Sequence, residues 1–373
     1  MIRSFIVMAS ICALLVPSLF AADTLPRELS DDAFWKLMSD YSEESGQFRF
    51  EYMSNEQEFQ VVIPRLIENR KPGGVYVGVG PEQNFTYIAA LQPKMAFIVD
   101  IRRDNMLEQL IYKTVFEMSA NRAEFLSHLF SRKMPAGLTE KTTARALFQA
   151  FRASSSDAAL FHQNLQAIKD RLLTGHKFRL SLDDVSQIDY IYRVFFDAGS
   201  ESTGNAFTPS GQNVYFGTAS YADLMTATDN HGEARSYLAN EENFRIIRDM
   251  ERKNLIVPIV GNFAGAKALR NVGRYIKDHN AAVAAMYTSN VEQYLYQQGD
   301  DWRKFLGNVA TFPLDGQSMF IRSSHFAYGD TRQPPRQASG RRFLQLLSPM
   351  AEVVKAFNAG KITGYEDVIQ LSR

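Results

Sequence analysis

VYVGVG at residues 75–80 is a short β-branched and aromatic run that ends in two glycines. A helix is expected at Thr86–Leu91, and a second continuous apolar run, Met95–Val99, ends at Asp100. A long helical pattern then extends from Asn105 to about Ser131. Continuous apolar runs of this length are typical of parallel strands that are buried on both faces. The order strand, glycine turn, helix, strand, acid and helix therefore predicts a βαβ unit.

The same alternation resumes in the second half of the chain. Strands are expected at Leu255–Val260, Ala282–Tyr287 and Ser318–Arg322, and helices at Ala266–Lys277, Val291–Tyr296 and Phe343–Asn358. Residues 133–213 lack buried-strand runs and carry helical patterns instead, at Thr142–Phe151 and Ala158–Leu173. The sequence therefore predicts an α/β fold with a doubly wound, mostly parallel sheet. We expect a single domain over residues 23–373, with a helical insertion or cap at about 133–213.

Capping residues in the sequence predict three further helices. They cover Asp31–Tyr41 after Ser30, Phe59–Ile67 after the capping box Ser54–Gln57, and part of Tyr237–Lys253 with Asn240 as its cap. Pro64 predicts a kink or an early break in the second of these helices. The stretch Arg332–Arg341, rich in proline, arginine and glutamine, is expected to be a loop.

The N-terminus has the layout of a secretory signal peptide. Arg3 supplies a positive charge, an apolar run follows over Phe5–Phe20, and small residues stand at Ala21 and Ala22. An uncleaved membrane anchor is the alternative, but the run is shorter than the roughly 20 apolar residues that a spanning helix needs. We therefore expect residues 1–22 to be removed. The mature protein is expected to be periplasmic or secreted, without stable membrane insertion.

Composition argues against several classes of partner and site. Lys and Arg total 41, as do Asp and Glu, so the chain has no cationic surplus with which to bind nucleic acid. The one cysteine, Cys12, lies in the signal region, so the mature chain is expected to have no disulfide or thiolate site. The six histidines lack the spacing of metal-binding motifs. The sequence also lacks the G-x-S-x-G motif, which argues against an ordinary α/β-hydrolase. We expect a small-molecule ligand and no metal.

In open α/β sheets, ligands bind beyond the carboxyl ends of the strands. Gly78 and Gly80 end the first predicted strand, where the absence of a Cβ allows a sharp turn and a close approach to a ligand. Asp100 closes the second strand 20 residues after Gly80, which is close to the spacing at which an acid meets ribose hydroxyls. This pattern favours a ligand that contains ribose. Alternatively, the glycines merely end a strand, and Glu82 caps the next helix together with Asn84.

Val77–Gly80 and Ile98–Asp100 resemble the glycine-rich first motif and the ribose-binding acid of the class I S-adenosylmethionine-dependent methyltransferases. The resemblance covers about Val75–Leu107 and, more loosely, the strand ends at Asn262 and Ser289–Asn290. It implies a Rossmann-like fold with S-adenosylmethionine as cofactor. It implies that the cofactor is held by Gly78, Gly80, Glu82, Asn84, Asp100 and Arg102. The methyl acceptor would then lie beside Asn262, Tyr287 and Asn290. Gly80–Phe85 also resembles a segment of an exported bacterial family. This second resemblance gives no indication of the function.

The loop after the first strand departs from related nucleotide-binding motifs. Glu82 stands where the methyltransferase motif has a third glycine, and Gln83 where the dinucleotide motif has one. Pro81 removes a backbone donor and Glu82 adds negative charge, which disfavours a pyrophosphate. The α-amino group of S-adenosylmethionine would instead pair with Glu82. We therefore expect a methyltransferase-like protein that binds this cofactor or a related nucleoside-type ligand.

Two alternatives stay open at this point. The first is an exported, non-enzymatic binding protein that kept a degenerate Rossmann fold, because the methyl donor is not obviously present outside the cytoplasm. The second is an NADP-linked oxidoreductase, in which Arg102 and Arg103 would neutralise a 2′-phosphate. The negative charge of Glu82 disfavours this second alternative. The fold alone does not decide among these three hypotheses.

Overall fold

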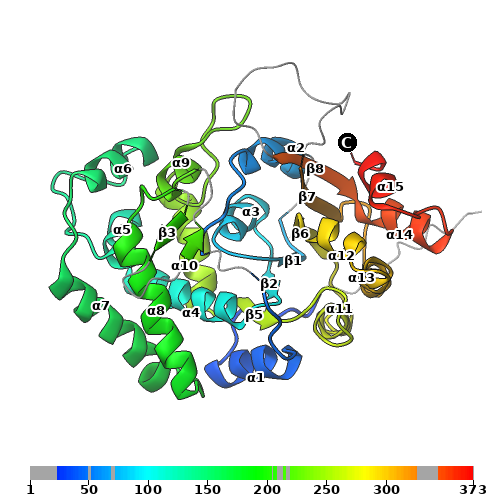
Figure 1. Cartoon of the computed structure of the whole chain (residues 1–373), viewed down its shortest axis with the longest axis horizontal. Helices are drawn as coiled ribbons and strands as arrows, with labels where there is room; N and C mark the ends of the chain where they lie inside the picture. The colour runs from blue at the N-terminus through cyan, green and yellow to red at the C-terminus, as the bar shows by residue number, and fades with distance from the viewer. Residues whose placement is uncertain are drawn as a thin grey trace, which may run out of the picture.

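The computed structural model describes residues 23–48, 52–68, 72–203, 205–207, 213–215, 219–325 and 343–372. The predictions of a signal peptide at residues 1–22 and of a loop at Arg332–Arg341 therefore lie outside the described residues. Figure 1 shows a central sheet with helices packed along its sides and a further group of helices beyond α4 (Arg103–Met118). The ends of the sheet strands position several residues of the site described below.

Six strands form the central sheet in the order β5-β2-β1-β6-β7-β8. They are β1 (Val75–Gly78), β2 (Met95–Asp100), β5 (Ile256–Val260), β6 (Val283–Ser289), β7 (Met319–His325) and β8 (Phe343–Pro349). All neighbours pair in parallel except β7 and β8, which pair antiparallel. The predicted α/β class and the mostly parallel sheet are thus confirmed. Every residue of β1, β2 and β5 is buried, which explains the continuous apolar runs in the sequence.

Helices lie on both sides of this sheet (Figure 1). On one side, α4 and α10 (Glu241–Arg252) pack against each other, and α10 also contacts α3 (Gln83–Leu91). On the other side, α13 (Asp301–Val309) contacts both α11 (Ala268–Asp278) and α12 (Val291–Gln297). At the two edges of the sheet, α1 (Asp31–Tyr41) contacts the edge strand β5, and α14 (Met350–Asn358) contacts the edge strand β8. The last helix, α15 (Tyr365–Gln370), packs against α12.

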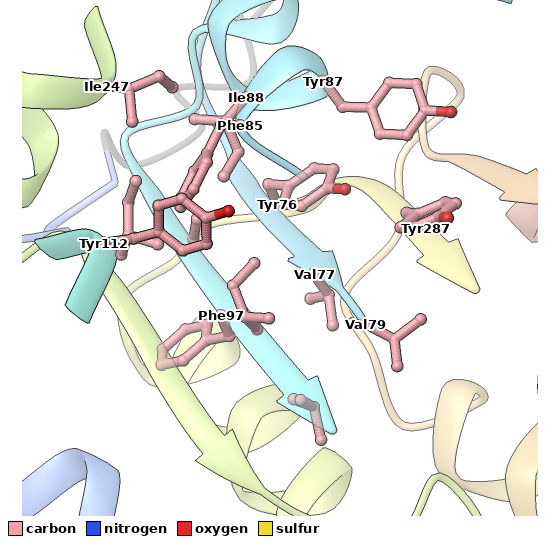
Figure 2. Close-up of a cluster of buried hydrophobic side chains, with 14 of the residues drawn as sticks. Tyr76, Val77, Val79, Phe85, Tyr87, Ile88, Phe97, Tyr112, Ile247 and Tyr287 are labelled. Carbon is pink, nitrogen blue, oxygen red and sulfur yellow. The ribbon is translucent and has the colours of Figure 1, made fainter. Parts of the chain in front are cut away.

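An aromatic cluster packs α3 against α4 and against the segment that precedes α10, and Figure 2 shows Phe85 and Tyr112 of this cluster. The ring of Phe85 meets those of Tyr112, Phe116 and Tyr237 edge-on, at centroid distances of 5.2, 5.3 and 5.4 Å. All four side chains are fully buried. Edge-to-face pairs of this kind contribute about 0.5–1.5 kcal/mol each beyond the area that they bury. The helix that follows β1 is therefore fixed in place, and with it the loop that joins the two.

The middle of the chain adds a helical layer beside α4. It comprises α5 (Arg122–Phe130), α6 (Ala144–Arg152), α7 (Ala158–Asp170), the π-helical turn η2 (Arg171–Gly175), α8 (Leu182–Ala198) and α9 (Tyr221–Thr226). Of these, α5 and α8 pack directly on α4. β3 (Asn205–Phe207) and β4 (Asn213–Tyr215) form a separate two-stranded sheet. The part of residues 133–213 that the structure describes therefore contributes no strand to the central sheet.

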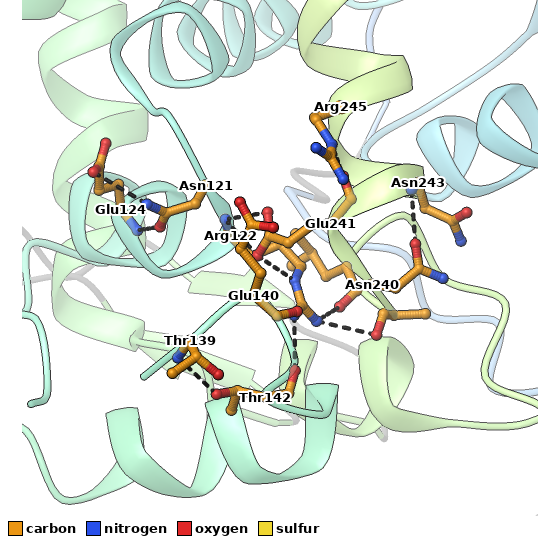
Figure 3. A network of polar contacts seen from close by, with 12 residues as sticks. Asn121, Arg122, Glu124, Thr139, Glu140, Thr142, Asn240, Glu241, Asn243 and Arg245 are labelled. Atoms are coloured by element: carbon orange, nitrogen blue, oxygen red, sulfur yellow. Dashed lines mark hydrogen bonds and ion pairs between the residues drawn. The ribbon is translucent and has the colours of Figure 1, made fainter. Parts of the chain in front are cut away.

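Arg122 ties this layer to the rest of the protein (Figure 3). Its Nε donates to Glu241 at the start of α10, at 2.8 Å. Its two terminal nitrogens donate to the backbone carbonyls of Leu238, Ala239, Glu140 and Thr142. The side chain is only 1% exposed. A buried guanidinium is tolerated when it is both paired and hydrogen-bonded, and Arg122 meets both conditions. The segment that precedes α6 is thereby held against α10.

The sequence predictions of two long helices are partly wrong. The helix predicted from Asn105 to Ser131 is split, because Asn121 caps a new helix by accepting a hydrogen bond from the N–H of Glu124. The helix predicted over residues 343–358 starts only at Met350. Its first seven residues form β8, because they pair with β7 along its whole length. Pairing with a distant strand overrides the local helical pattern there.

The capping box predicted at Ser54–Gln57 does not form as expected. The hydroxyl of Ser54 donates to the side-chain oxygen of Gln83 in α3. The predicted helix at Phe59–Ile67 is instead a 3₁₀ turn, η1 (Phe59–Val62), followed by the short α2 (Ile63–Ile67). Pro64 lies in the first turn of α2, where its missing N–H costs no hydrogen bond. In contrast, the caps predicted at Ser30 and Asn240 are confirmed.

His176 links α1 to α4 through two carboxylates. Its Nδ1 lies 2.9 Å from Oδ1 of Asp31, and its Nε2 lies 2.8 Å from Oε2 of Glu117. Burial alone would lower the pKa of His176, but the hydrogen bonds to the two acids and the charge of Glu117 outweigh it and raise that pKa. Burial likewise would raise the pKa of Glu117, but the hydrogen bond from His176 and the charge of Lys113 lower it.

We predict that His176→Gln lowers the free energy of unfolding by about 1–2 kcal/mol at pH values of about 4.5–6.5. A raised histidine pKa gives stability that is fully present below the unfolded pKa of about 6.5 and is lost as the pH rises through the folded pKa. A lowered glutamate pKa gives stability that is lost as the pH falls through the folded pKa. Urea denaturation from about pH 3 to about pH 9 measures both effects, because the two losses lie on either side of the range of about pH 4.5–6.5. His231→Gln, at an exposed turn, is the control, and a pH-independent difference for His176→Gln would contradict the prediction.

Candidate functional site

A cavity of about 170 Å³ lies at the carboxyl ends of β1, β2, β5 and β6. Its lining includes residues that end or follow these four strands: Gly80, Asp100, Arg102, Gly261, Asn262, Ser289 and Asn290. It also includes four aromatic rings, those of Phe48, Phe263, Tyr287 and Tyr294. The strand order reverses between β1 and β6, since β2 and β5 extend to one edge and β7 and β8 to the other. Ligands of open α/β sheets bind at such a reversal.

The structure brings most of the predicted site residues to this cavity. Its lining residues include Gly80, Asp100, Arg102, Asn262, Tyr287 and Asn290. Gly78, Glu82 and Asn84, which were predicted to hold the cofactor, are not among them. Gly78 is the last residue of β1, Glu82 lies directly before α3 and Asn84 lies in the first turn of α3, where they have other contacts.

Asn84 holds the loop after β1 in shape. Its side-chain nitrogen donates to the carbonyls of Val79, Gly80 and Pro81, at 2.9, 3.2 and 2.7 Å. A Cβ at Gly78 would lie 1.9 Å from the side-chain oxygen of Asn84, so glycine is required there. Gly80 is required for another reason, because its φ is +80°. The glycine pair therefore serves the shape of the loop, and Gly80 alone of the two reaches the cavity.

Glu82 is fully buried beside the segment that carries Ser54. Both of its carboxyl oxygens accept from the backbone N–H of Ser54, at 3.2 Å each. Burial raises the pKa of Glu82 to about 7. The structure thus gives Glu82 a different contact from the one predicted, since it faces the protein's own backbone rather than the α-amino group of a ligand.

Asp100 and Arg102 form a buried ion pair at the edge of the cavity. Oδ1 of Asp100 accepts from the backbone N–H and from Nε of Arg102, at 2.8 and 3.1 Å, and Oδ2 accepts from Nη2 at 3.2 Å. A carboxylate has about four acceptor positions, and three of them are used here. Asp100 therefore has no room to accept both hydroxyls of a ribose while Arg102 stays in place. The arrangement favours a structural role for Asp100, as the partner of Arg102, over the predicted contact with a ribose.

We predict that Asp100→Asn lowers the free energy of unfolding by about 3 kcal/mol, because it leaves the buried guanidinium of Arg102 without its negative partner. Urea denaturation measures the change. The control is Asp300→Asn, whose partner Arg303 is 56% exposed, and it should cost less than about 1 kcal/mol. An Asp100→Asn protein of unchanged stability with weakened ligand affinity would restore the ribose-binding role.

Glu43 occupies the start of α11. Its Oε1 accepts from the backbone N–H groups of Lys267 and Ala268, at 2.7 and 2.8 Å, and its Oε2 accepts from that of Asn262 at 3.0 Å. The N-terminus of a helix is the usual place for a phosphate in such folds. Here the chain's own carboxylate takes that place. No local sequence pattern points to Glu43, because it lies more than 200 positions from the groups that it binds.

Glu56 and Ser289 also line the cavity, but the sequence analysis did not name them as site residues. Glu56 lines the cavity, is 1% exposed, and accepts hydrogen bonds from Gln83, Gln345 and Ser289. In the sequence it stood inside a predicted capping box, which gave no reason to single it out. The position of Ser289 at the end of a predicted strand was the one available signal. Among the described lining residues, the charged ones are Glu56, Asp100 and Arg102, so the cavity has no excess of positive charge.

Comparison with known families gives one match. The family described as Domain of unknown function (DUF7790) matches residues 52–358, a range that includes all six strands of the central sheet. No curated protein matches the chain. Within the residues that the structure describes, no helix is long and apolar enough to cross a bilayer. The same residues contain no group of three or more His, Cys, Asp or Glu arranged to hold a metal ion.

Proposed function

The chain belongs to the DUF7790 family, and we propose that it binds a small, neutral, nucleoside-type ligand in the cavity at the carboxyl ends of β1, β2, β5 and β6. The observation that carries the proposal is the position of the cavity where the strand order reverses. We further propose that the sheet is a doubly wound, Rossmann-like one. The strand order and the helices on both sides support this (Figure 1).

The size of the cavity limits the ligand. A cavity of about 150 Å³ in another protein holds one benzene molecule, so about 170 Å³ holds a single ring system. A whole S-adenosylmethionine is larger, and only the base of its nucleoside part would fit without movement of the surrounding segments. Methyl transfer, the enzymatic form of the proposal, requires such movement. The non-enzymatic binding of a nucleoside through its base does not, and the cavity favours it.

The lining also suits an uncharged ring. Phe48 and Tyr294 lie edge to face at 5.4 Å and offer aromatic surface to a base. The amides of Asn262 and Asn290 provide hydrogen-bonding groups of the kind that match the edges of nucleobases. Phosphates are disfavoured, because Glu43 already occupies the start of α11 and the lining has no surplus cation. NADP is therefore the least favoured of the ligands considered.

We predict that adenosine and S-adenosylhomocysteine raise the melting temperature of the mature chain, residues 23–373, whereas NADP⁺ does not. A ligand at 100 times its dissociation constant adds about 2.7 kcal/mol of stability. Calorimetry should show Asn262→Ala weakening binding by about tenfold, the loss of one hydrogen bond. Asn271→Ala, on α11 outside the cavity, is the control. Tighter binding of NADP⁺ than of adenosine, or no stabilisation by any nucleoside at millimolar concentration, would overturn the proposal.

We also propose that the protein acts outside the cytoplasm, in the periplasm or the medium, after loss of residues 1–22. The short apolar run Phe5–Phe20 and the small residues after it support this. N-terminal sequencing of the protein from the producing cells is expected to begin at Ala22 or Asp23. An intact Met1 in the membrane fraction would contradict the prediction.

A further inference from the structure

Ser289 differs from the other described non-glycine residues that have a positive φ. Five of the six lie at or just after the end of a helix, where the left-handed conformation is common: Gln92, Ser131, Lys177, Asn254 and Asn280. Ser289, with a φ of +50°, instead ends β6 and lines the cavity. A non-glycine residue in this region is strained, and such strain gathers at functional sites.

The strand is also irregular at this position. Tyr287 pairs with Ile321 of β7, whereas Ser289 pairs with the next residue, Arg322, so β6 has one extra residue, Thr288. A bulge of this kind bends a strand and redirects the side chain that follows. The bulge and the left-handed backbone together turn Ser289 toward the cavity and toward Glu56.

The carboxylate of Glu56 is held in one orientation beside the hydroxyl of Ser289. Oγ of Ser289 donates to Oε1 of Glu56 at 2.5 Å. The other oxygen, Oε2, accepts from Nε2 of Gln83 at 2.8 Å and from Nε2 of Gln345 at 3.1 Å. The two amides therefore fix one oxygen and leave the second to the serine. A nucleophile within hydrogen-bond reach of a base that a third group orients is the arrangement of nucleophilic catalysis.

We propose that Ser289 and Glu56 are the nucleophile and the general base of an acyl-transfer reaction on a small, uncharged ester that carries one ring. Gln83 and Gln345 are the positioning residues of the base. The inference rests on the proposed function, because it requires the same cavity to admit a neutral, ring-sized molecule. It adds a reaction that binding alone does not require, and it does so without the G-x-S-x-G motif.

The reaction proceeds in two stages with water as the second reactant. Oγ of Ser289 attacks the ester carbonyl carbon and its proton passes to Oε1 of Glu56, while the carbonyl π pair moves onto oxygen. When the tetrahedral intermediate collapses, the bond to the leaving oxygen breaks, and Glu56 returns the proton to release the alcohol. Water then attacks the acyl-serine and gives a proton to Glu56. That proton passes back to Ser289 as the carboxylic acid leaves.

The test uses p-nitrophenyl acetate, an uncharged ester with one ring, and the mature wild-type protein. We expect a burst of nitrophenol and one acetyl group on Ser289 by peptide mass spectrometry. Ser289→Gly removes the hydroxyl and suits the positive φ, so this variant should fold normally and show neither signal. Glu56→Gln should slow acylation at least about a hundredfold, the usual contribution of a general base. Ser186→Ala, at an exposed position in α8, is the control and should match the wild type.

The outcomes separate this inference from the proposed function. Acetylation of Ser289 together with no nucleoside binding would uphold the acyl transfer and reject the nucleoside-type ligand. Nucleoside binding without any acetyl-serine at position 289 would uphold the nucleoside-type ligand and reject the acyl transfer. Equal acylation rates in the wild type and in a folded Ser289→Gly protein would overturn the inference, as would acylation that Glu56→Gln leaves unchanged.

Discussion

The structure depends on the burial of β1, β2 and β5 on both faces. The side chains of a strand alternate between the two faces of a sheet, so apolar residues at every position require a cover on each side. The helices provide that cover, and the edge-to-face rings around Phe85 fix α3 in place. The polar side chains that these strands bring to the cavity stand at or just after the strand ends. Asp100, Asn262 and Ser289 come from three different strand ends and reach one cavity for this reason.

Four carboxylates at or beside that cavity have partners within the chain. Asp100 pairs with Arg102, and Glu43 binds the backbone at the start of α11. Glu82 binds the backbone of Ser54, and Glu56 binds two amides and a hydroxyl. A charge left unpaired in a buried place is costly, so these pairings are a condition of stability. They also mean that the cavity presents no strong unpaired charge, which favours a neutral ligand over a phosphorylated one.

The sequence predicted best what depends on local pattern. The strand at Met95–Asp100 could be read from its apolar run, and the cap at Asn240 from its residue type and the helix after it. β8 was missed, because its residues become a strand only by pairing with β7. The same limit applies to the site. Asp100 and Asn262 could be placed at strand ends, but Glu56 meets Gln345 across 289 positions of sequence, and no local pattern encodes such a contact.

Two positions at the edge of the cavity show how conformation and chemistry compete. Gly80 and Ser289 both have a positive φ, and at Gly80 the chain uses the residue that adopts it without strain. Glycine at position 289 would likewise remove the strain, but it would also remove the hydrogen bond to the buried carboxylate of Glu56. The chain carries a hydroxyl there, held by a bulge on one side and by an oriented carboxylate on the other. Backbone strain of this kind gathers at functional sites, so the strain at Ser289 is itself an argument that its hydroxyl is used.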